Sequence, residues 1–359
     1  MMYEYWFAKV QGIGAGKKRR LREYLGDAQT IFNIEETRIS SINFLSEKEQ
    51  KKLVEAKKEK KLEEEYRELE KEQIQFVPWH MENYPEKLKN ISNPPYALYV
   101  KGELPDERKP SIAIVGARNC TPYGEAWAME YGQALSRCGV QIISGMARGI
   151  DAAGQRGALN AEGNTFAVLG CGVDICYPKE HRGLYLDIQK CGGIISEYVP
   201  KTLPLSGNFP PRNRIISGLS DVVLIMEARD KSGSLITADM ALEQGRDIYA
   251  LPGPVNSPLS QGCHLLISQG AGILISPSDL LKKLHISSEK LDKYSCKRKK
   301  ELERPENIVY SCLDLYPKGL QQLVEETGIS PERIVRDLIS LQLEGKVKEI
   351  SKNHYVKTL

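Results

Sequence analysis

Residues 111–151 read SIAIVGARNCTPYGEAWAMEYGQALSRCGVQIISGMARGID, and this stretch decides the fold. It contains two short apolar runs, Ser111–Gly116 and Val140–Ser144, and a helical segment between them that starts near Thr121-Pro122. Each run is followed by a loop that contains glycine. Short apolar runs that alternate with helices are typical of parallel strands covered on both faces of a sheet.

The same pattern continues through residues 76–285. It predicts an α/β fold with a Rossmann-like, doubly wound and mostly parallel sheet. Residues 76–110 are expected to lead into this sheet as extended or turn-like chain, because prolines interrupt them. The further apolar runs are Thr165–Gly170, Gly193–Ser196, Asp221–Met226, Asp247–Leu251 and Gly272–Ile275.

Three other segments flank or follow this sheet. Residues 1–75 are rich in lysine and glutamate and are expected to form a small helical domain of the helix-hairpin-helix/SAM-like kind. Residues 286–304 are polar and read as a linker. Residues 305–359 follow the order helix, helix, turn, helix, hairpin, with Ser330-Pro331 at the start of a helix, which predicts a winged-helix domain.

Composition argues against several classes of protein. The net charge is only +3, so a nucleic-acid surface must come from how the charges are arranged. No stretch approaches the ~20 apolar residues of a membrane span. The start lacks a basic segment followed by an apolar run, so we expect a cytoplasmic protein. The eight cysteines and five histidines show no metal-ligand spacing, and neither a metal nor a disulfide framework is expected.

The loops after the predicted strands are suited to an anion. In an open parallel sheet, ligands bind outside the carboxyl ends of the strands. Gly116, Gly145 and Gly172 follow three of these strands, and glycine lets backbone N–H groups approach a ligand closely. A later loop leads into a helix whose N-terminus would attract negative charge. Its hydroxyl donors are Ser232, Ser234 and Thr237.

Basic residues gather in the same loops. Residues 111–285 carry fifteen Lys/Arg and fifteen Asp/Glu, so this domain is neutral as a whole. A row of cations along one edge of a neutral domain suits a phosphate track. For Arg212 and Arg214 the alternative is an ion pair with Glu197 or Glu227 that holds the loops together. The eight basic residues in the loops are Arg118, Arg148, Lys179, Arg182, Lys201, Arg212, Arg214 and Lys231.

The motifs of common enzymes are missing. The chain has no G-x-x-x-x-G-K-[ST] phosphate loop, and its first strand–helix turn is not G-x-G-x-x-G. It also lacks a G-x-S-x-G nucleophile elbow. We therefore expect no catalytic residues, no cofactor and no enzymatic activity.

Six motifs follow one another in the central part of the chain. They are GAR at Gly116–Arg118, Gly145–Asp151, Gly170–Lys179, FPPRNRIISGLS at Phe209–Ser220, SGSLITA at Ser232–Ala238, and GRDIYALPG at Gly245–Gly253. In these motifs and their order the chain resembles the bacterial DNA-processing DprA/Smf family, strongly over residues 76–285. The resemblance departs from the family pattern at Gly262-Cys263-His264, where the family usually has a small polar residue and asparagine.

The resemblance implies a function and a site. Members of this family bind single-stranded DNA cooperatively, form homodimers through the Rossmann-like domain and load the RecA recombinase in natural transformation. By position, Arg118 and Lys179 correspond to the basic pair that binds DNA. The resemblance makes Arg148, Arg212 and Arg214 neighbours in the same pocket, and Asn213 lies between the last two in their motif.

Two alternatives stay open. Related Rossmann-like sheets include nucleoside-monophosphate phosphoribohydrolases, so the pocket could instead belong to a small-molecule nucleotide-binding enzyme or sensor. Those enzymes carry a P-G-G-x-G-T loop, whereas this chain has SGSLITA at the corresponding place. A purely structural scaffold would leave the clustered loop cations unexplained.

The flanking domains give weaker signals. Val10–Lys17 resembles a helix-hairpin-helix turn that could hold a phosphate, but a helix cap with a solvated basic face explains it equally well. Residues 305–359 carry seven Lys/Arg against eight Asp/Glu. Because attraction to phosphates supplies most non-specific affinity for DNA, this near-neutral balance favours a protein-contact or accessory role there.

Overall fold

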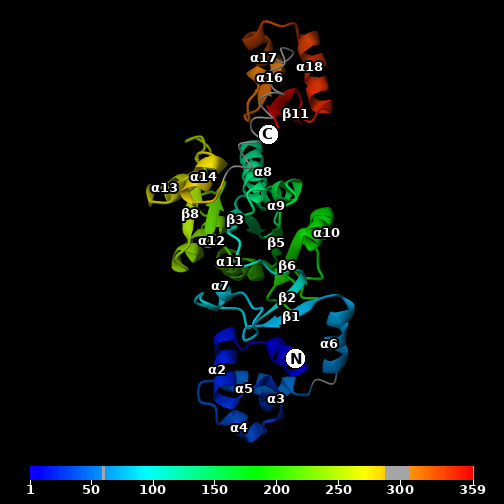
Figure 1. The fold of residues 1–359 in the computed structure, drawn as a ribbon, viewed down its shortest axis with the longest axis vertical. Coiled ribbons are helices and arrows are strands. Elements are labelled where there is room, and N and C mark those ends of the chain that lie inside the picture. The colour runs from blue at the N-terminus through cyan, green and yellow to red at the C-terminus, as the bar shows by residue number, and fades with distance from the viewer. Residues whose placement is uncertain (59–60, 288–307, 359) are drawn as a thin grey trace.

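The computed structural model describes residues 1–58, 61–287 and 308–358, and Figure 1 shows their arrangement. Nearly all of the expected linker, residues 288–304, lies outside the described residues. The N-terminal helices lie at one end of the molecule, the large sheet in the middle and the C-terminal unit at the other end (Figure 1).

The N-terminal segment folds into short helices around aromatic side chains. Trp6 and Phe7 are fully buried and stack on each other, with ring centroids 5.8 Å apart. Ser46 and Glu49 form a capping box that starts one of these helices, since each side chain bonds the other residue's backbone N–H. The helices are α1 (Met2–Lys9), α2 (Ala15–Leu25), α3 (Ala28–Asn33), α4 (Glu36–Ser40), α5 (Glu47–Ala56) and α6 (Leu62–Lys71).

Nine strands form one sheet within the described residues, in the order β1-β2-β6-β5-β4-β3-β7-β8-β9. The pairs β1–β2 and β2–β6 are antiparallel, and the other neighbours are parallel. The strands are β1 (Gln75–Pro78), β2 (Ala97–Gly102), β3 (Ser111–Val115), β4 (Gln141–Ser144), β5 (Thr165–Val168), β6 (Gly192–Ser196), β7 (Val222–Ile225), β8 (Asp247–Ala250) and β9 (Gly272–Ile273).

Helices cover both faces of this sheet, as the strand composition requires. On β3, Ile112 and Ile114 pack toward α8, α9 and α14, while Ala113 and Val115 pack toward α11, α12 and α13. Alternate side chains of a strand point to opposite faces, so a strand that is apolar throughout needs cover on both. The helices are α7 (Glu86–Lys89), α8 (Pro122–Arg137), α9 (Ile150–Asn160), α10 (Arg182–Cys191), α11 (Phe209–Gly218), α12 (Gly233–Glu243), α13 (Gln261–Ser268) and α14 (Pro277–Lys283), with 3-10 turns η1 (Lys179–His181) and η2 (Ser206–Asn208).

The C-terminal unit has its own small core, built around Leu323, Ile334, Leu338 and Leu341. Its strands pair in the order β10-β12-β11. Helices followed by a hairpin are compatible with a winged-helix domain. The elements are α16 (Ile308–Cys312), β10 (Lys318–Gly319), α17 (Leu320–Thr327), α18 (Pro331–Leu343), β11 (Val347–Ser351) and β12 (His354–Lys357).

The predicted fold class is confirmed. Each of the seven apolar runs contains a strand of the large sheet, from β3 to β9. Strands β1 and β2 were not predicted from the sequence, because prolines and turns surround them and they pair antiparallel at one side of the sheet. In the described part of the chain, no helix is long and apolar enough to cross a bilayer.

The contact between α8 and α9 depends on glycine and gives a stability prediction. A Cβ at Gly157 would overlap the carbonyl oxygen of Met129, whereas a Cβ at Gly183 on α10 would meet nothing within 4 Å. We expect Gly157→Ala to lower the free energy of unfolding by about 1–3 kcal/mol, because the two helices must move apart. Urea denaturation followed by circular dichroism measures this change.

The matched control is Gly183→Ala, which adds the same methyl group in open space on a helix. Its stability should be unchanged or slightly higher, because alanine favours the helix over glycine. Equal stability of the two variants would contradict the close packing of α8 on α9.

Candidate functional site

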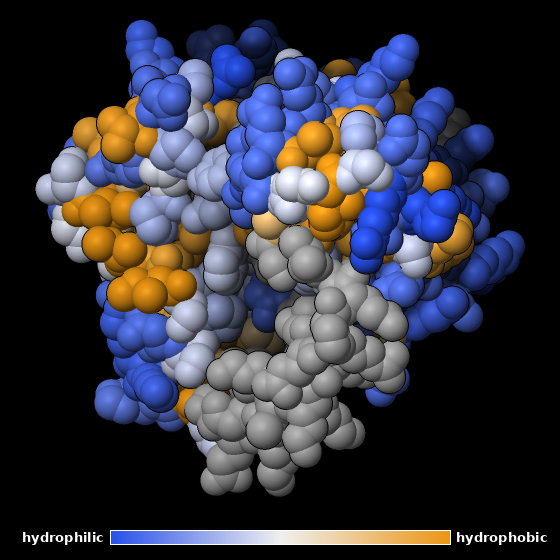
Figure 2. Space-filling model, turned by 90° about the horizontal axis from the view of Figure 1, so that it is seen from above, coloured by the Kyte–Doolittle hydropathy of each residue, from blue (hydrophilic) through white to orange (hydrophobic). Residues whose placement is uncertain are grey.

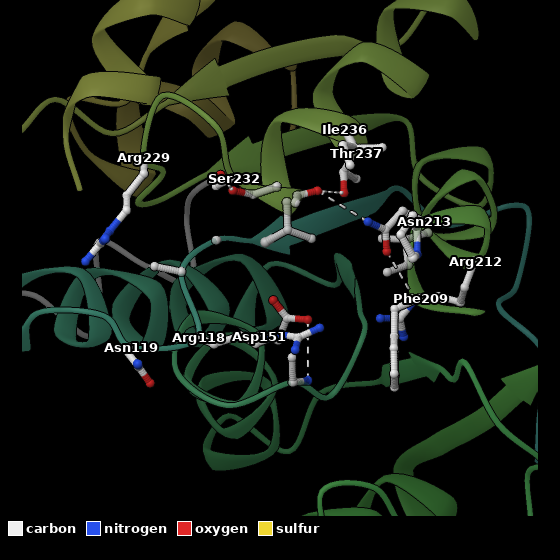
Figure 3. A pocket seen from close by; sticks show the side chains of 18 of the residues that line it. Arg118, Asn119, Asp151, Phe209, Arg212, Asn213, Arg229, Ser232, Ile236 and Thr237 are labelled. Carbon is white, nitrogen blue, oxygen red and sulfur yellow. Dashed lines mark hydrogen bonds between the residues drawn. The ribbon is translucent and has the colours of Figure 1, made fainter. Parts of the chain in front are cut away.

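The carboxyl end of β3 is the point where the sheet's connections diverge. Its neighbours are β4 on one side and β7 on the other, so the chain leaves β3 toward one half of the sheet and returns later to the other half. Loops that diverge in this way leave a crevice at the carboxyl ends of the strands. A cavity of about 440 Å³ lies there, between the loops after β3, β4 and β7 and the starts of α11 and α12 (Figure 3).

One wall of this cavity offers hydroxyl groups at a helix N-terminus. Ser232 is the N-cap position of α12, and its hydroxyl lies 2.5 Å from that of Ser234. Thr237, one turn further, also lines the cavity. The Asn213 side-chain amide donates to the carbonyl oxygen of Gly233 at 3.4 Å and joins α11 to this wall. The first N–H groups of α12 and these hydroxyls favour an anion in the cavity.

The opposite wall carries Arg118, from the loop after β3. Its side chain is exposed, and its guanidinium lies over the ring of Phe209, 5.5 Å from the centroid. Within the described residues, no carboxylate forms an ion pair with Arg118. A cation that rests on an aromatic ring and has no acidic partner is ready to bind a phosphate.

A smaller hollow of about 60 Å³ adjoins the cavity. Arg118, Phe209 and Arg212 line both spaces. Tyr177 adds a 40% exposed ring that packs on Phe209, with centroids 5.5 Å apart and planes at 34°. Such a pair of rings beside cations is the arrangement on which nucleic-acid bases stack.

Arg212 is part of the pocket wall but is itself buried, with 4% of its surface exposed. Its guanidinium donates to the carbonyl oxygen of Gly145, at 3.1 Å, directly after β4, and to that of Val168, the last residue of β5. Burial lowers the pKa of Arg212 to about 10, and the nearby Asp151 carboxylate opposes that change. Arg212 thus connects the loops that follow β4 and β5 through buried hydrogen bonds.

Asp151 completes this buried arrangement. Its carboxylate accepts hydrogen bonds from the backbone N–H groups of Gly145, at 3.1 Å, and Ala147, at 3.4 Å. Burial raises the pKa of Asp151, while Arg212 and these donors lower it. A Cβ at Gly145 would lie 2.7 Å from the Arg212 guanidinium and 2.8 Å from the Asp151 carboxylate, so only glycine fits there.

Two of the predicted arginines form ion pairs. Arg148 is exposed and pairs with Glu180. Arg214 makes a two-pronged pair with Glu197, with N–O distances of 2.7 and 2.6 Å, and it does not line either cavity. For Arg214, the structure thus shows the ion pair with Glu197 that the sequence offered as an alternative to phosphate contact.

The remaining predicted residues occupy different places. Gly116 lines the cavity, and Gly145 lines the smaller hollow. Lys179 begins η1 in an exposed position next to Tyr177-Pro178; among the described residues it has no ion-pair partner. Gly172 lies against Pro200 and Lys201, away from both spaces.

Three polar residues of the cavity wall were not among the predicted site residues. Asn119 directly follows Arg118, Arg229 lies in the loop after β7, and Asp151 lies in the first turn of α9. All three lie in or next to loops that follow apolar runs in the sequence, so the signal was present. However, polar residues of these kinds are also common on protein surfaces that bind no ligand, so the sequence did not single them out as ligand contacts.

A family model described as DNA recombination-mediator protein A matches residues 75–285, more than half of the 359 residues. Protein Smf of Escherichia coli (strain K12) is 41% identical over 244 residues, which cover 68% of this chain and 63% of that protein.

Two solved structures resemble the fold. DNA processing protein A of Streptococcus pneumoniae matches with a TM-score of 0.70 and 33% identity, over 79% of this chain and 97% of that one. The structure of the Helicobacter pylori protein, which concerns its mode of binding single-stranded DNA, matches with a TM-score of 0.53 and 31% identity, over 59% and 95% of the two chains. On the extent of the family match and the identity to these proteins, the chain belongs to the DNA recombination-mediator protein A family, which includes the DprA and Smf proteins.

Proposed function

We propose that this protein binds single-stranded DNA along the carboxyl edge of its sheet and needs no chemical step to act on it. The observation that carries the proposal is an unpaired cation, Arg118, beside two packed aromatic rings where the cavity and the smaller hollow meet. Arg118 has no acidic partner among the described residues and rests on Phe209, which in turn packs on Tyr177. Phosphates would bind Arg118, Lys179 and the start of α12, while bases stack on the rings.

The resemblance to the Helicobacter pylori protein supports this choice of ligand, because its structure concerns single-stranded DNA. A duplex holds its bases inside and cannot offer them to Tyr177 and Phe209. The different environments of the predicted cations indicate which of them can contact the phosphates. Of the five cations predicted for the site, Arg212 is buried, and Arg214 and Arg148 are paired with glutamates. We therefore assign direct phosphate contact to the other two, Arg118 and Lys179.

We further propose that the bound strand is passed to the RecA recombinase during natural transformation, and that the protein works in the cytoplasm. The family description as a recombination mediator supports this role. A strand held on an exposed edge, instead of inside a closed channel, would remain accessible to a second protein.

We propose that the protein is a homodimer, with its interface at the β9 edge of the sheet. Apolar side chains gather there on α12, α13 and the chain after β9. Ile275 is 68% exposed, and Leu242, Leu265 and Ile273 are exposed as well. Hydrophobic residues are visible at the left of Figure 2, the side on which Figure 1 shows α13 and α14. An unpaired strand edge with apolar cover is a suitable surface for a second copy.

Replacing either free cation should weaken DNA binding. We expect Arg118→Ala and Lys179→Ala each to bind a labelled oligothymidine about tenfold more weakly, because each loses a charge-assisted bond to phosphate. Fluorescence anisotropy over a salt series measures the affinity, and the slope of log K against log salt should become shallower by about 0.7 per lost contact.

Lys190→Ala is the control for these two variants, since this exposed lysine sits at the end of α10 that leads into β6, at the opposite edge of the sheet. It should bind like the wild type. Equal affinity of all four proteins, or equal binding to the matching duplex, would refute the proposed interface. Competition by AMP would favour the nucleotide-binding alternative.

Glu180 should limit binding, because it neutralises Arg148. Its carboxylate accepts hydrogen bonds from its own backbone N–H and from the Arg148 side chain, and both lower its pKa. Glu180→Gln keeps the shape and removes the charge, so we expect binding a few-fold tighter in the same assay. Glu63→Gln, at the exposed Glu63–Arg67 pair on α6, should have no effect. A Glu180→Gln protein no tighter than wild type would show that Arg148 does not contact DNA.

Charging the β9 edge should separate the dimer. Ile275→Glu places a carboxylate in the apolar patch and should halve the mass measured by light scattering after gel filtration. Leu343→Glu, at an 86% exposed position on the C-terminal unit, is the matched control and should keep the wild-type mass. A dimer that survives Ile275→Glu would place the interface elsewhere.

A further inference from the structure

The C-terminal unit contacts the DNA-binding domain through two stacked rings. Tyr316, in the turn before β10, lies parallel to Tyr123 in the first turn of α8, with centroids 5.6 Å apart and planes at 11°. The Tyr123 hydroxyl donates to the carbonyl oxygen of Pro252 at 2.8 Å, which fixes that ring on the sheet domain. Figure 1 accordingly shows the C-terminal unit next to α8.

The β11–β12 hairpin, which we call the wing, lies on the side of the C-terminal unit that faces α8 (Figure 1). Burial, together with the carboxylates of Glu125 and Glu227, raises the pKa of Cys120 to about 12, while the ammonium of Lys348 on β11 opposes this rise. Cys120 directly follows Asn119, which lines the large cavity.

This contact lies at one particular end of the cavity. Figure 3 shows Asn119 and Arg229 at one end and Phe209 and Arg212 at the other. The Phe209 end adjoins the smaller hollow with Tyr177. The C-terminal unit borders the Asn119 end, so the hollow, the cavity and Tyr316 follow one another along the edge of the sheet.

The charges of the C-terminal unit are unevenly distributed. Residues 346–357, which contain the wing, carry four lysines and one glutamate, whereas residues 308–345 carry three Lys/Arg and six Asp/Glu. Lys346 pairs with Glu344, and Lys357 lies over the ring of Tyr310. Lys348 and Lys352 are exposed and have no carboxylate partner in residues 1–58, 61–287 and 308–358. Although the net charge of the C-terminal unit is close to zero, its wing therefore carries exposed, unpaired lysines.

Tyr316 has one face free. Its ring covers Tyr123 on one side, yet 45% of the residue is exposed. The turn that carries it is fixed, because its backbone N–H donates to the Asp314 carboxylate at 2.7 Å. A fixed, half-exposed ring with another ring behind it can add a nucleic-acid base to the stack at little entropic cost.

We propose that the C-terminal unit forms the second half of the strand path: a single strand that leaves the cavity past Asn119 stacks a base on Tyr316 and lays its phosphates along Lys348 and Lys352 of the wing. This inference rests on the proposed binding of single-stranded DNA. It replaces the expectation that a near-neutral C-terminal segment has only an accessory or protein-contact role.

The length of the DNA separates this second contact from the first. In the full-length protein, an oligothymidine of about 6 nucleotides fills the cavity region alone, whereas one of about 20 nucleotides also reaches the wing. We expect Tyr316→Ala and Lys348→Glu each to bind the longer DNA about fivefold or more weakly and the shorter DNA like the wild type. Arg118→Ala should weaken binding of both lengths.

Two controls test the chemistry of the contact. Tyr316→Phe keeps the ring and should bind both lengths like the wild type. Tyr24→Ala, at a 64% exposed tyrosine on α2 of the N-terminal domain, should also leave both affinities unchanged.

The other outcomes overturn the inference in distinguishable ways. If the wild type binds neither length, both this proposal and the proposed function fail. Should the wild type bind both while Tyr316→Ala and Lys348→Glu match it at both lengths, the second contact fails and the proposed function stands. Tighter binding by Tyr316→Ala would show that the C-terminal unit blocks the cavity instead of extending it.

Discussion

The position of β3 between β4 and β7 is the constraint on which the site depends. Because the chain leaves β3 toward one half of the sheet and comes back to the other, the loops at this edge diverge and leave a cavity. The same order of strands aims the start of α12 into that cavity and puts Arg118 across from it. The backbones of α8 and α9, the helices that follow β3 and β4, meet closely at Gly157.

The arginines of the site differ in burial, and their contacts differ accordingly. Arg212 lies below the loops, where it meets carbonyl oxygens of β4 and β5 and the Asp151 carboxylate. A buried guanidinium is tolerated because these acceptors and the charge replace water. Its presence holds the loop walls in place, and Arg118 can then remain exposed and free of acidic partners in the described chain. The cation that holds the loops is thus a different residue from the one to which we assign phosphate contact.

The C-terminal unit shows why net charge is a poor guide to a binding surface. Its basic residues gather in the wing and its acidic residues in the helices, so the two cancel in the sum. What matters for a strand is the potential where the strand lies. The contact between Tyr316 and Tyr123 connects two segments that are far apart in the chain.

The strands from β3 to β9, the hairpin β11–β12 and the loops of the site could be predicted from the sequence, because apolar runs, glycines and helix starts are local signals. The cations without acidic partners could be identified only once the chain was folded. Arg148 meets Glu180 across 32 positions and Arg214 meets Glu197 across 17, and no local pattern selects such partners. The antiparallel strands β1 and β2 and the contact of Tyr316 with Tyr123 could not be predicted for the same reason. Each is a pairing of segments separated in the chain, with no periodic signal of its own.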